Sequence, residues 1–253
     1  MASHGGDFDY EAHGAGYAAI RRPDSRIEAL VHAALGDART VLNVGAGAGS
    51  YEPTDRHVIA LEPAAAMRAQ RGPDRVPAIA GFAEALPLDD GAVDAVMAIM
   101  TVHQWSDLDA GLAELRRVSR GPVVVLAGDG DRLPLYWLND YAPDLIAAEQ
   151  LRYPPIAHIA RRIGRTAQVQ AVPIPLDCTD GFTEAFYGRP ERLLDPAVRK
   201  AQSSWGFMPE GAEARFVESL SADLASGHWD DRHVHLRTQP TFESSMRLIV
   251  GQP

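Results

Sequence analysis

The sequence predicts an α/β fold, in which a doubly wound and largely parallel sheet is covered by helices and carries a helical cap. Two observations predict the sheet: short apolar runs without polar alternation recur up to about residue 128, and helical patterns lie between them. A third observation predicts the cap. Beyond residue 128 the chain becomes rich in proline, arginine and aromatic residues.

The first expected element is a helix that begins after Asp24 and ends at Gly36. Asp24 is a good N-terminal cap, and the apolar residues that follow recur at helical spacing. These residues are Ile27, Leu30, Val31, Ala34 and Leu35. A helix with one apolar face of this kind should pack against a sheet.

The remaining elements follow the same patterns of hydrophobicity. Strands are expected at 41–44, 58–61, 76–80, 93–100 and 123–127, with helices at 64–71 and 107–118. Two further strands are expected at 169–174 and 246–250. The mostly helical segment between them, which includes a helix at 210–225, is too long for a simple connection, so we expect it to form a cap over the functional site.

Composition excludes several classes of protein. The 253 residues carry a formal net charge of −10, which opposes unselective binding to a nucleic acid. The single cysteine, Cys178, excludes an intramolecular disulfide and a multi-thiolate zinc site. No run of residues approaches the roughly 18 apolar residues of a membrane span, and residues 1–10 are polar and acidic. We therefore expect a cytoplasmic protein with neither nucleic-acid nor membrane partners, for which a homodimer is one compatible state.

The most informative segment is the buried strand at 41–44, which runs into a turn containing Gly45, Gly47 and Gly49. Glycines in such a turn allow positive φ angles and let a ligand approach the backbone closely. The next strand ends in Glu62, a carboxylate that can accept both hydroxyl groups of a ribose at the carboxyl edge of the sheet. Together these features predict a nucleoside pocket.

A dinucleotide is the less favoured ligand. It requires a third small residue at a fixed position, followed by a helix whose N-terminus receives the diphosphate. Ser50 occupies that position, and only residues 50–57, with Pro53 among them, separate the turn from the next strand. This length leaves little room for a helix. A nicotinamide-dependent oxidoreductase is thus an alternative, and a ligand without phosphates is favoured.

An ordered set of motifs resembles the class I S-adenosylmethionine-dependent methyltransferases, and among them the subgroup that modifies small molecules. The motifs are the runs at 41–50, 60–63 and 83–96, the helix at 112–118 and the strand at 123–126. The resemblance implies a Rossmann-like seven-stranded sheet, mostly parallel with an antiparallel last strand. It also implies S-adenosyl-L-methionine as cofactor and methyl transfer to an oxygen, nitrogen or carbon of a small molecule, such as a specialised metabolite.

On this resemblance the chain divides into four segments. Residues 1–36 would form an N-terminal helical lid, and residues 37–175 the cofactor-binding core. Residues 176–241 would form the helical substrate cap, and residues 242–253 the last strand of the core.

The resemblance also implies a set of cofactor-binding residues. Gly45, Ala46 and Gly47 would lie under the amino-acid part of the cofactor, and Glu62 would bind its ribose. Residues expected around the adenine are Pro63, Met67, Phe82, Ala83 and Glu84. Ile99 and Met100 would offer carbonyl groups to the ammonium of the cofactor. Tyr17 and Arg22 match an N-terminal pattern that closes over it, where an arginine suits a carboxylate.

Two residues and the length of one connection depart from the pattern of the family. Asn43 stands where an acidic residue is usual, Phe82 replaces a common aspartate, and the connection after Gly49 is short. Adenine recognition at Phe82 would then depend on stacking and on the backbone. These departures leave open a further alternative, in which the protein binds the cofactor without methyl transfer and acts as a cyclase, an isomerase or a binding partner.

Methyl transfer from a sulfonium needs alignment and exclusion of water, and a base only where the acceptor must lose a proton. His103, after the fourth strand, is the first candidate for that base, and Tyr17 is a second catalytic candidate. Weaker candidates to face the substrate are Tyr10, His13, Asp177 and Asp180. Cys178 has no nucleophilic role to fill, because methyl transfer needs no covalent enzyme intermediate.

No metal site is expected. Asp129 and Asp131 follow the fifth strand, but the surrounding pattern differs from that of cation-dependent enzymes. His228, His233 and His235 lie close in sequence without the spacing of a third ligand. Aromatic residues of the second half could line an acceptor pocket. They are Trp137, Tyr141, Phe182, Phe186, Tyr187, Trp205 and Phe207.

Overall fold

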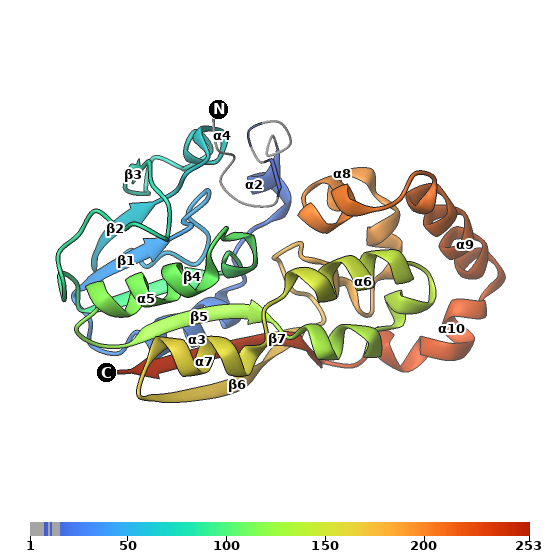
Figure 1. Ribbon diagram of the computed structural model, residues 1–253. Coiled ribbons are helices and arrows are strands. Elements are labelled where there is room, and N and C mark those ends of the chain that lie inside the picture. Colours follow the sequence, from blue (N-terminus) through green and yellow to red (C-terminus); the bar gives the residue numbers. More distant parts are fainter. Residues whose placement is uncertain (1–7, 10, 12–15) are drawn as a thin grey trace.

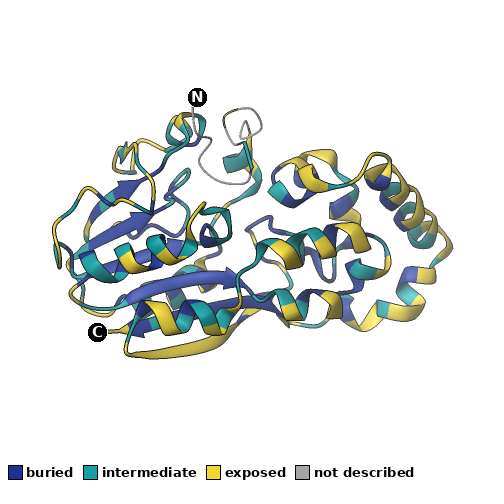
Figure 2. Ribbon diagram, in the orientation of Figure 1, coloured by how far each residue is buried: buried dark blue, intermediate teal, exposed yellow. Residues whose placement is uncertain are grey.

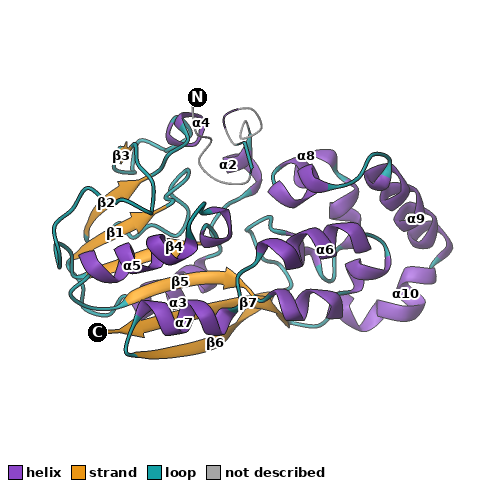
Figure 3. Cartoon of the chain, in the orientation of Figure 1, coloured by secondary structure: helices purple, strands orange, loops and turns teal. Residues whose placement is uncertain are grey.

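The structure is a computed structural model, and it describes residues 8, 9, 11 and 16–253. A seven-stranded sheet occupies one end of the molecule and a group of helices the other (Figure 1, Figure 3). The strands are β1 (Thr40–Val44), β2 (His57–Leu61), β3 (Ala78–Ile79), β4 (Ala95–Ile99), β5 (Val123–Gly128), β6 (Thr166–Pro175) and β7 (Thr241–Gln252). Their spatial order is β3-β2-β1-β4-β5-β7-β6.

Strand direction confirms the predicted fold class. Strands β1 to β5 pair in parallel, whereas β7 runs antiparallel to its two neighbours, β5 and β6. The sheet is therefore mostly parallel with an antiparallel last strand. Its central strands are buried, and β6 forms an exposed edge (Figure 2).

Helices cover both faces of the sheet. Helices α5 (Leu108–Val118) and α7 (Ile156–Ile163) pack on the face that includes Val123 and Val125 of β5. Helix α3 (Ser25–Ala34) packs on the opposite face, toward Val124 and Leu126 (Figure 1). Successive side chains of β5 point to opposite faces of the sheet. The strand therefore needs an uninterrupted apolar run to pack against the helices on both faces.

The helix starts follow from capping. Asp24 accepts a hydrogen bond from the amide of Arg26 at 3.0 Å, and α3 begins at the next residue, Ser25. Asp107 accepts from the amide of Ala110 at 2.9 Å at the start of α5. Each carboxylate satisfies an amide that has no partner within its helix.

Several expected elements are too long. The helix expected at 64–71 is α4, which covers only Ala65–Arg68. The strand expected at 76–80 shrinks to the two residues of β3, because this edge strand pairs with β2 alone. In the strand expected at 93–100, Val93 forms only an isolated bridge with Ser119, and Met100 adopts a positive φ of 53° that ends β4.

The connection between β1 and β2 contains no helix, as its length predicts. Tyr51 and Glu52 of this connection are buried and help to cover the sheet where a crossover helix would otherwise lie. Tyr51 packs in the same cluster as Ile27 and Val31 of α3. A loop with two buried side chains thus takes the place of the crossover helix between β1 and β2.

The segment between β6 and β7 is mostly helical. It contains α8 (Pro196–Lys200), α9 (Ala212–Ser226) and α10 (His228–His233) together with several 3₁₀ turns. Helix α6 (Pro143–Arg152), which follows β5 in sequence, packs against the 3₁₀ turn η6 (Ser203–Phe207) of this segment. The helical layer therefore draws on two separate parts of the chain. None of the helices in the described ranges has both the length and the apolar character that a bilayer span requires.

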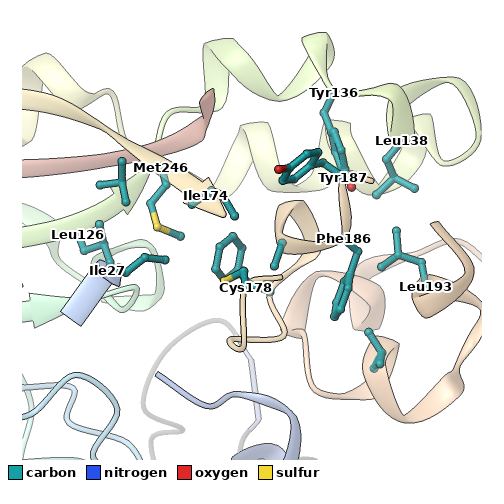
Figure 4. Close-up of a cluster of buried hydrophobic side chains, with 14 of the residues drawn as sticks. Ile27, Leu126, Tyr136, Leu138, Ile174, Cys178, Phe186, Tyr187, Leu193 and Met246 are labelled. Carbon is teal, nitrogen blue, oxygen red and sulfur yellow. The ribbon is translucent and has the colours of Figure 1, made fainter. Parts of the chain in front are cut away.

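The sheet and the helical layer share one hydrophobic core. Figure 4 shows Ile27, Leu126 and Met246 beside the sheet, with Phe186 and Leu193 in the helical layer. The cluster runs without a break from one part to the other. The carboxyl end of β5 points toward this layer (Figure 1).

Candidate active site

The glycine turn after β1 packs directly against the end of β4. Gly45 has a φ of 67°, and a Cβ added there would lie 2.8 Å from Cβ of Thr101 and overlap its hydroxyl group. Both the backbone conformation and the space therefore require glycine at this position. Gly47 also has a positive φ, of 50°.

Glu62 ties this turn to the end of β2. Its carboxylate accepts from the amide of Gly47 and from the amide of Ala64, both at 2.9 Å. Burial raises the pKa of Glu62 above its usual range, while the two amides and nearby arginines act in the opposite direction. The side chain is 7% exposed and lines a cavity. A carboxylate held in this way is oriented before any ligand arrives.

The cavity at this edge has a volume of about 400 Å³, within the usual range for small-molecule sites. It brings together most of the residues that the sequence predicts for a cofactor site. Those that line it are Tyr17, Gly45, Gly47, Glu62, Pro63, Met67, Phe82, Ala83, Glu84, Ile99 and Met100.

Two predicted residues lie outside the lining of this cavity. Ala46 is buried, and its amide donates to the carbonyl of Leu61 at 2.9 Å. Arg22 donates through Nε to the carbonyl of Ala19 at 3.0 Å and does not reach the cavity. Its neighbour Arg21 points inward instead and lines a second cavity.

Two lining residues have side-chain environments that fit different roles. The ring of Phe82 is 43% exposed, a large value for an apolar side chain at a cavity. The Glu84 carboxylate already accepts from the amide and hydroxyl of Ser106, at 2.9 and 2.8 Å, and from the amide of Asp107 at 3.2 Å. Glu84 thus fixes the loop before α5, and Phe82 leaves a flat apolar surface available.

Sequence reasoning missed Gln104, Trp105 and Ser106 as lining residues. The Trp105 ring lies over Gly111 of α5, where an added Cβ would be 2.8 Å from the ring atom Cζ3. A glycine inside an otherwise regular amphipathic helix was the available signal that a large group packs there.

A buried ion pair supports the glycine turn from behind. Nη2 of Arg71 lies 2.8 and 2.9 Å from the two carboxylate oxygens of Glu52, and their side chains are 4% and 2% exposed. Asn43 donates to the same carboxylate at 3.0 Å. Arg71 also donates to the carbonyl of Gly47 at 3.3 Å. Glu52, from the short connection that follows the turn, therefore places a buried carboxylate beside Asn43.

A second cavity, of about 50 Å³, adjoins the first between the sheet edge and the helical layer. Tyr17, Met100 and Gln104 line both cavities. His103 lines the second, and its ring meets that of Tyr153 edge-on with centroids 5.1 Å apart. The candidate base predicted from the sequence thus lies beside the first cavity rather than in it.

Asp180 joins three segments next to this second cavity. It pairs with Nε of Arg21 at 2.6 Å and accepts from the hydroxyl of Tyr51 at 2.8 Å. Asp177 is exposed and pairs with Arg26. Asp180 therefore holds the N-terminal segment against the helical layer, and neither aspartate lines a cavity.

The remaining candidates do not assemble into a site. Cys178 is buried, and burial raises its pKa to about 12, so it stays a thiol at neutral pH. Asp129 caps the 3₁₀ turn that follows β5. Across the described positions, no three histidine, cysteine, aspartate or glutamate side chains group as metal ligands would. Tyr10 and His13 lie outside the described residues.

A family of known proteins matches the part of the chain that contains the glycine turn, about one third of its length. Residues 42–125 match the family described as a methyltransferase domain. This match bears out the class I S-adenosylmethionine-dependent methyltransferase resemblance of the sequence motifs. No curated protein matches the sequence.

Solved structures extend the match over nearly the whole chain. A protein of Anabaena variabilis, assigned as a methyltransferase of an antibiotic biosynthesis pathway, is 29% identical with a TM-score of 0.84. The alignment covers 92% of this chain and 98% of that one. A Thermotoga maritima S-adenosylmethionine-dependent methyltransferase, described as a possible histamine N-methyltransferase, is 15% identical, with 96% and 97% coverage and a TM-score of 0.57. The [4+2]-cyclase SpnF is 14% identical, with 96% and 90% coverage and a TM-score of 0.52. These last two share the fold.

Proposed function

We propose that this chain, which carries a methyltransferase domain over residues 42–125, binds S-adenosyl-L-methionine in the first cavity and methylates a small molecule. The observation that carries the proposal is the joint position of the glycine turn and the Glu62 carboxylate on one cavity wall. The Anabaena variabilis methyltransferase, which is 29% identical and is covered over 98% of its length by the alignment, supports the same reaction class. Its assignment to an antibiotic biosynthesis pathway favours a specialised metabolite as acceptor.

The cofactor-binding roles follow the lining of the cavity. Glu62 accepts from the ribose hydroxyls, and the turn at Gly45 and Gly47 lies under the amino-acid part. Phe82 stacks on the adenine, because its ring is exposed and no carboxylate stands at that position. Tyr17 covers the cofactor from the N-terminal segment. Arg22 stays a weaker proposal, since its guanidinium bonds to the backbone at Ala19.

The cofactor supplies an electrophilic methyl group on a positively charged sulfur. The protein aligns the acceptor, excludes water and removes a proton where the acceptor carries one. His103 is the proposed base, because it lines the smaller cavity that adjoins the first. Tyr17, which lines both cavities, is the proposed positioning residue between cofactor and acceptor.

A dinucleotide fits this arrangement poorly. The residues between β1 and β2 form turns, so no helix N-terminus points at the position of a diphosphate. A protein that keeps the cofactor without methyl transfer is the second candidate, because a cyclase shares the fold. The two candidates differ in turnover and not in cofactor binding.

The test is a calorimetric titration of the full chain with S-adenosylmethionine, S-adenosylhomocysteine and NADH in parallel. Micromolar binding of the first two and no binding of NADH is the expected result. Binding of NADH, or of none of the three, would overturn the proposal. Formation of S-adenosylhomocysteine with a metabolite panel then distinguishes methyl transfer from cofactor binding alone.

A further inference from the structure

The second cavity is too small for a whole metabolite. Its volume of about 50 Å³ corresponds to roughly four water positions by the usual allowance per buried water. Because it shares Tyr17, Met100 and Gln104 with the cofactor cavity, a group placed in it lies next to the cofactor site. The cavity therefore suits the reacting end of an acceptor, and its lining determines which chemical group that end carries.

Two carboxyl groups line this cavity, one from each part of the helical layer. Glu149 belongs to α6, and its Oε2 accepts from the hydroxyl of Tyr153 at 3.2 Å. Glu184 belongs to the 3₁₀ turn η4 (Thr183–Phe186), is 7% exposed, and accepts from the amide of Ser245 at 2.8 Å. Arginines act on these carboxyl groups as nearby charges: Arg152 and Arg21 favour the ionised form of Glu149, and Arg247 favours that of Glu184, although burial outweighs them at both positions.

The cations closest to the cavity have other partners. Arg21 lines the cavity but pairs with Asp180 at 2.6 Å. Arg247 is directed toward Asp129, at 3.8 Å. The guanidinium of Arg152 stacks 4.4 Å over an aromatic ring and donates to a serine hydroxyl. The cavity is thus lined by more acidic than basic charge.

Burying two carboxylates beside one cavity is unfavourable, because each loses its hydration and the two charges repel one another. Burial, together with the charge of Glu149, raises the pKa of Glu184 to about 7. Burial likewise raises the pKa of Glu149. Other titratable groups that face the cavity are Tyr136, Tyr153 and His103. A cation in the cavity would let both carboxyl groups ionise, whereas an anionic ligand would oppose both.

An ammonium group matches this lining. It is compact, carries three N–H donors, and forms charge-assisted hydrogen bonds to carboxylate oxygens. Resting on the proposed function, we propose that the second cavity binds the amino group of the methyl acceptor, with Glu149 and Glu184 as its counter-charges. The acceptor class is therefore a small primary or secondary amine.

The proton and electron movements balance with residues already in place. The ammonium gives one proton to the imidazole of His103, which lines the same cavity. The freed nitrogen lone pair then forms a bond to the methyl carbon, and the carbon–sulfur bond breaks with its electron pair remaining on sulfur. The product is a methylated ammonium, whose positive charge again faces Glu149 and Glu184.

The first experiment compares probes of equal length and different charge. The full chain is titrated calorimetrically with n-butylamine, butan-1-ol and butyrate, each with and without saturating S-adenosylhomocysteine. We expect n-butylamine to bind at least tenfold more tightly than the alcohol and butyrate not to bind. Equal binding of amine and alcohol would overturn the inference. Because the amine is also tested alone, failure of S-adenosylhomocysteine to bind would refute the proposed function and leave this result readable.

The second experiment removes one charge at a time. Glu149→Gln and Glu184→Gln should each weaken n-butylamine binding at least tenfold and leave the affinity for S-adenosylhomocysteine unchanged. Glu218→Gln, on the exposed face of α9, is the matched control and should change neither. Undiminished amine binding in both cavity variants would overturn the inference.

A proton count gives a readout that a purely structural role would not change. At pH 7, ionisation of Glu184 on amine binding should release protons, which titrations in buffers of different ionisation enthalpy measure. The release should disappear in Glu184→Gln. Amine binding to the wild-type protein without proton release would contradict the assignment of Glu184 as a counter-charge.

Discussion

The ion pair behind the glycine turn gives a quantitative test of how this fold supports its site. In Glu52→Gln, Arg71 keeps its charge in a position where its side chain is 4% exposed, and it loses a carboxylate that it contacts at 2.8 and 2.9 Å. Removing one partner of a buried pair costs about 3–5 kcal/mol. We expect the free energy of unfolding to fall by about that amount. Because Arg71 also bonds to Gly47, binding of S-adenosylhomocysteine should weaken as well.

Urea unfolding followed by circular dichroism measures the first effect and calorimetry the second. Asp90→Asn is a matched control, since it breaks an ion pair with Arg117 of the same 2.8 Å length in which Asp90 is 84% exposed. An exposed pair of this kind should contribute little to stability. The double variant Glu52→Gln with Arg71→Met should regain part of the loss, because it removes the buried charge. Equal losses in Glu52→Gln and Asp90→Asn would refute the reasoning.

Four further results are expected. Glu62→Ala should weaken cofactor binding by about 1.5–3 kcal/mol, the usual contribution of hydrogen bonds to a charged group, and an unchanged dissociation constant would refute its role. Gly45→Ala should destabilise the protein and reduce cofactor affinity, whereas Gly72→Ala, with open space around it, should do neither in the same unfolding and binding assays. His103→Gln should lower kcat at least about 100-fold if the imidazole takes the proton, and a near-normal kcat would leave it an orienting role. The folded-state pKa of Glu184, about 7, exceeds its ordinary value, so its contribution to stability is present at low pH and is lost as the pH rises through about 7. The wild-type free energy of unfolding should therefore fall by about 3 kcal/mol relative to Glu184→Gln between about pH 5 and pH 8, and parallel pH profiles would contradict this.

Features encoded over a few residues could be predicted from the sequence. The caps at Asp24 and Asp107, the glycine turn and the carboxylate at the end of β2 each depend on local pattern. The order of the central strands follows from the same periodicity. Strand ends were less predictable, because the contacts made there are distant in sequence: Val93 bridges to Ser119, and the amide of Met100 donates to the carbonyl of Leu126.

Features that depend on packing could not be predicted. Glu52 forms an ion pair with Arg71, and Glu149 lines the same cavity as Glu184. Both arrangements arise because loops and helices that carry no sequence motif pack together in the fold. The choice between Arg21 and Arg22 is of the same kind. Both follow a four-residue helix, and the residue that turns inward is the one opposite Asp180.

The contacts of Asp180 have a consequence for engineering the helical layer. This carboxylate holds Arg21 of the N-terminal segment and Tyr51 of the loop after the glycine turn, and the sheet and helices share one continuous core. The two halves should consequently melt in a single transition. A chimaera that exchanges the segment between β6 and β7 for one from another enzyme, in order to change specificity, must therefore keep an acid opposite Arg21. Without that acid, the guanidinium of Arg21 would be buried without its ion-pair partner between the N-terminal segment and the helical layer. The unfolding transition of the chimaera would then be less cooperative.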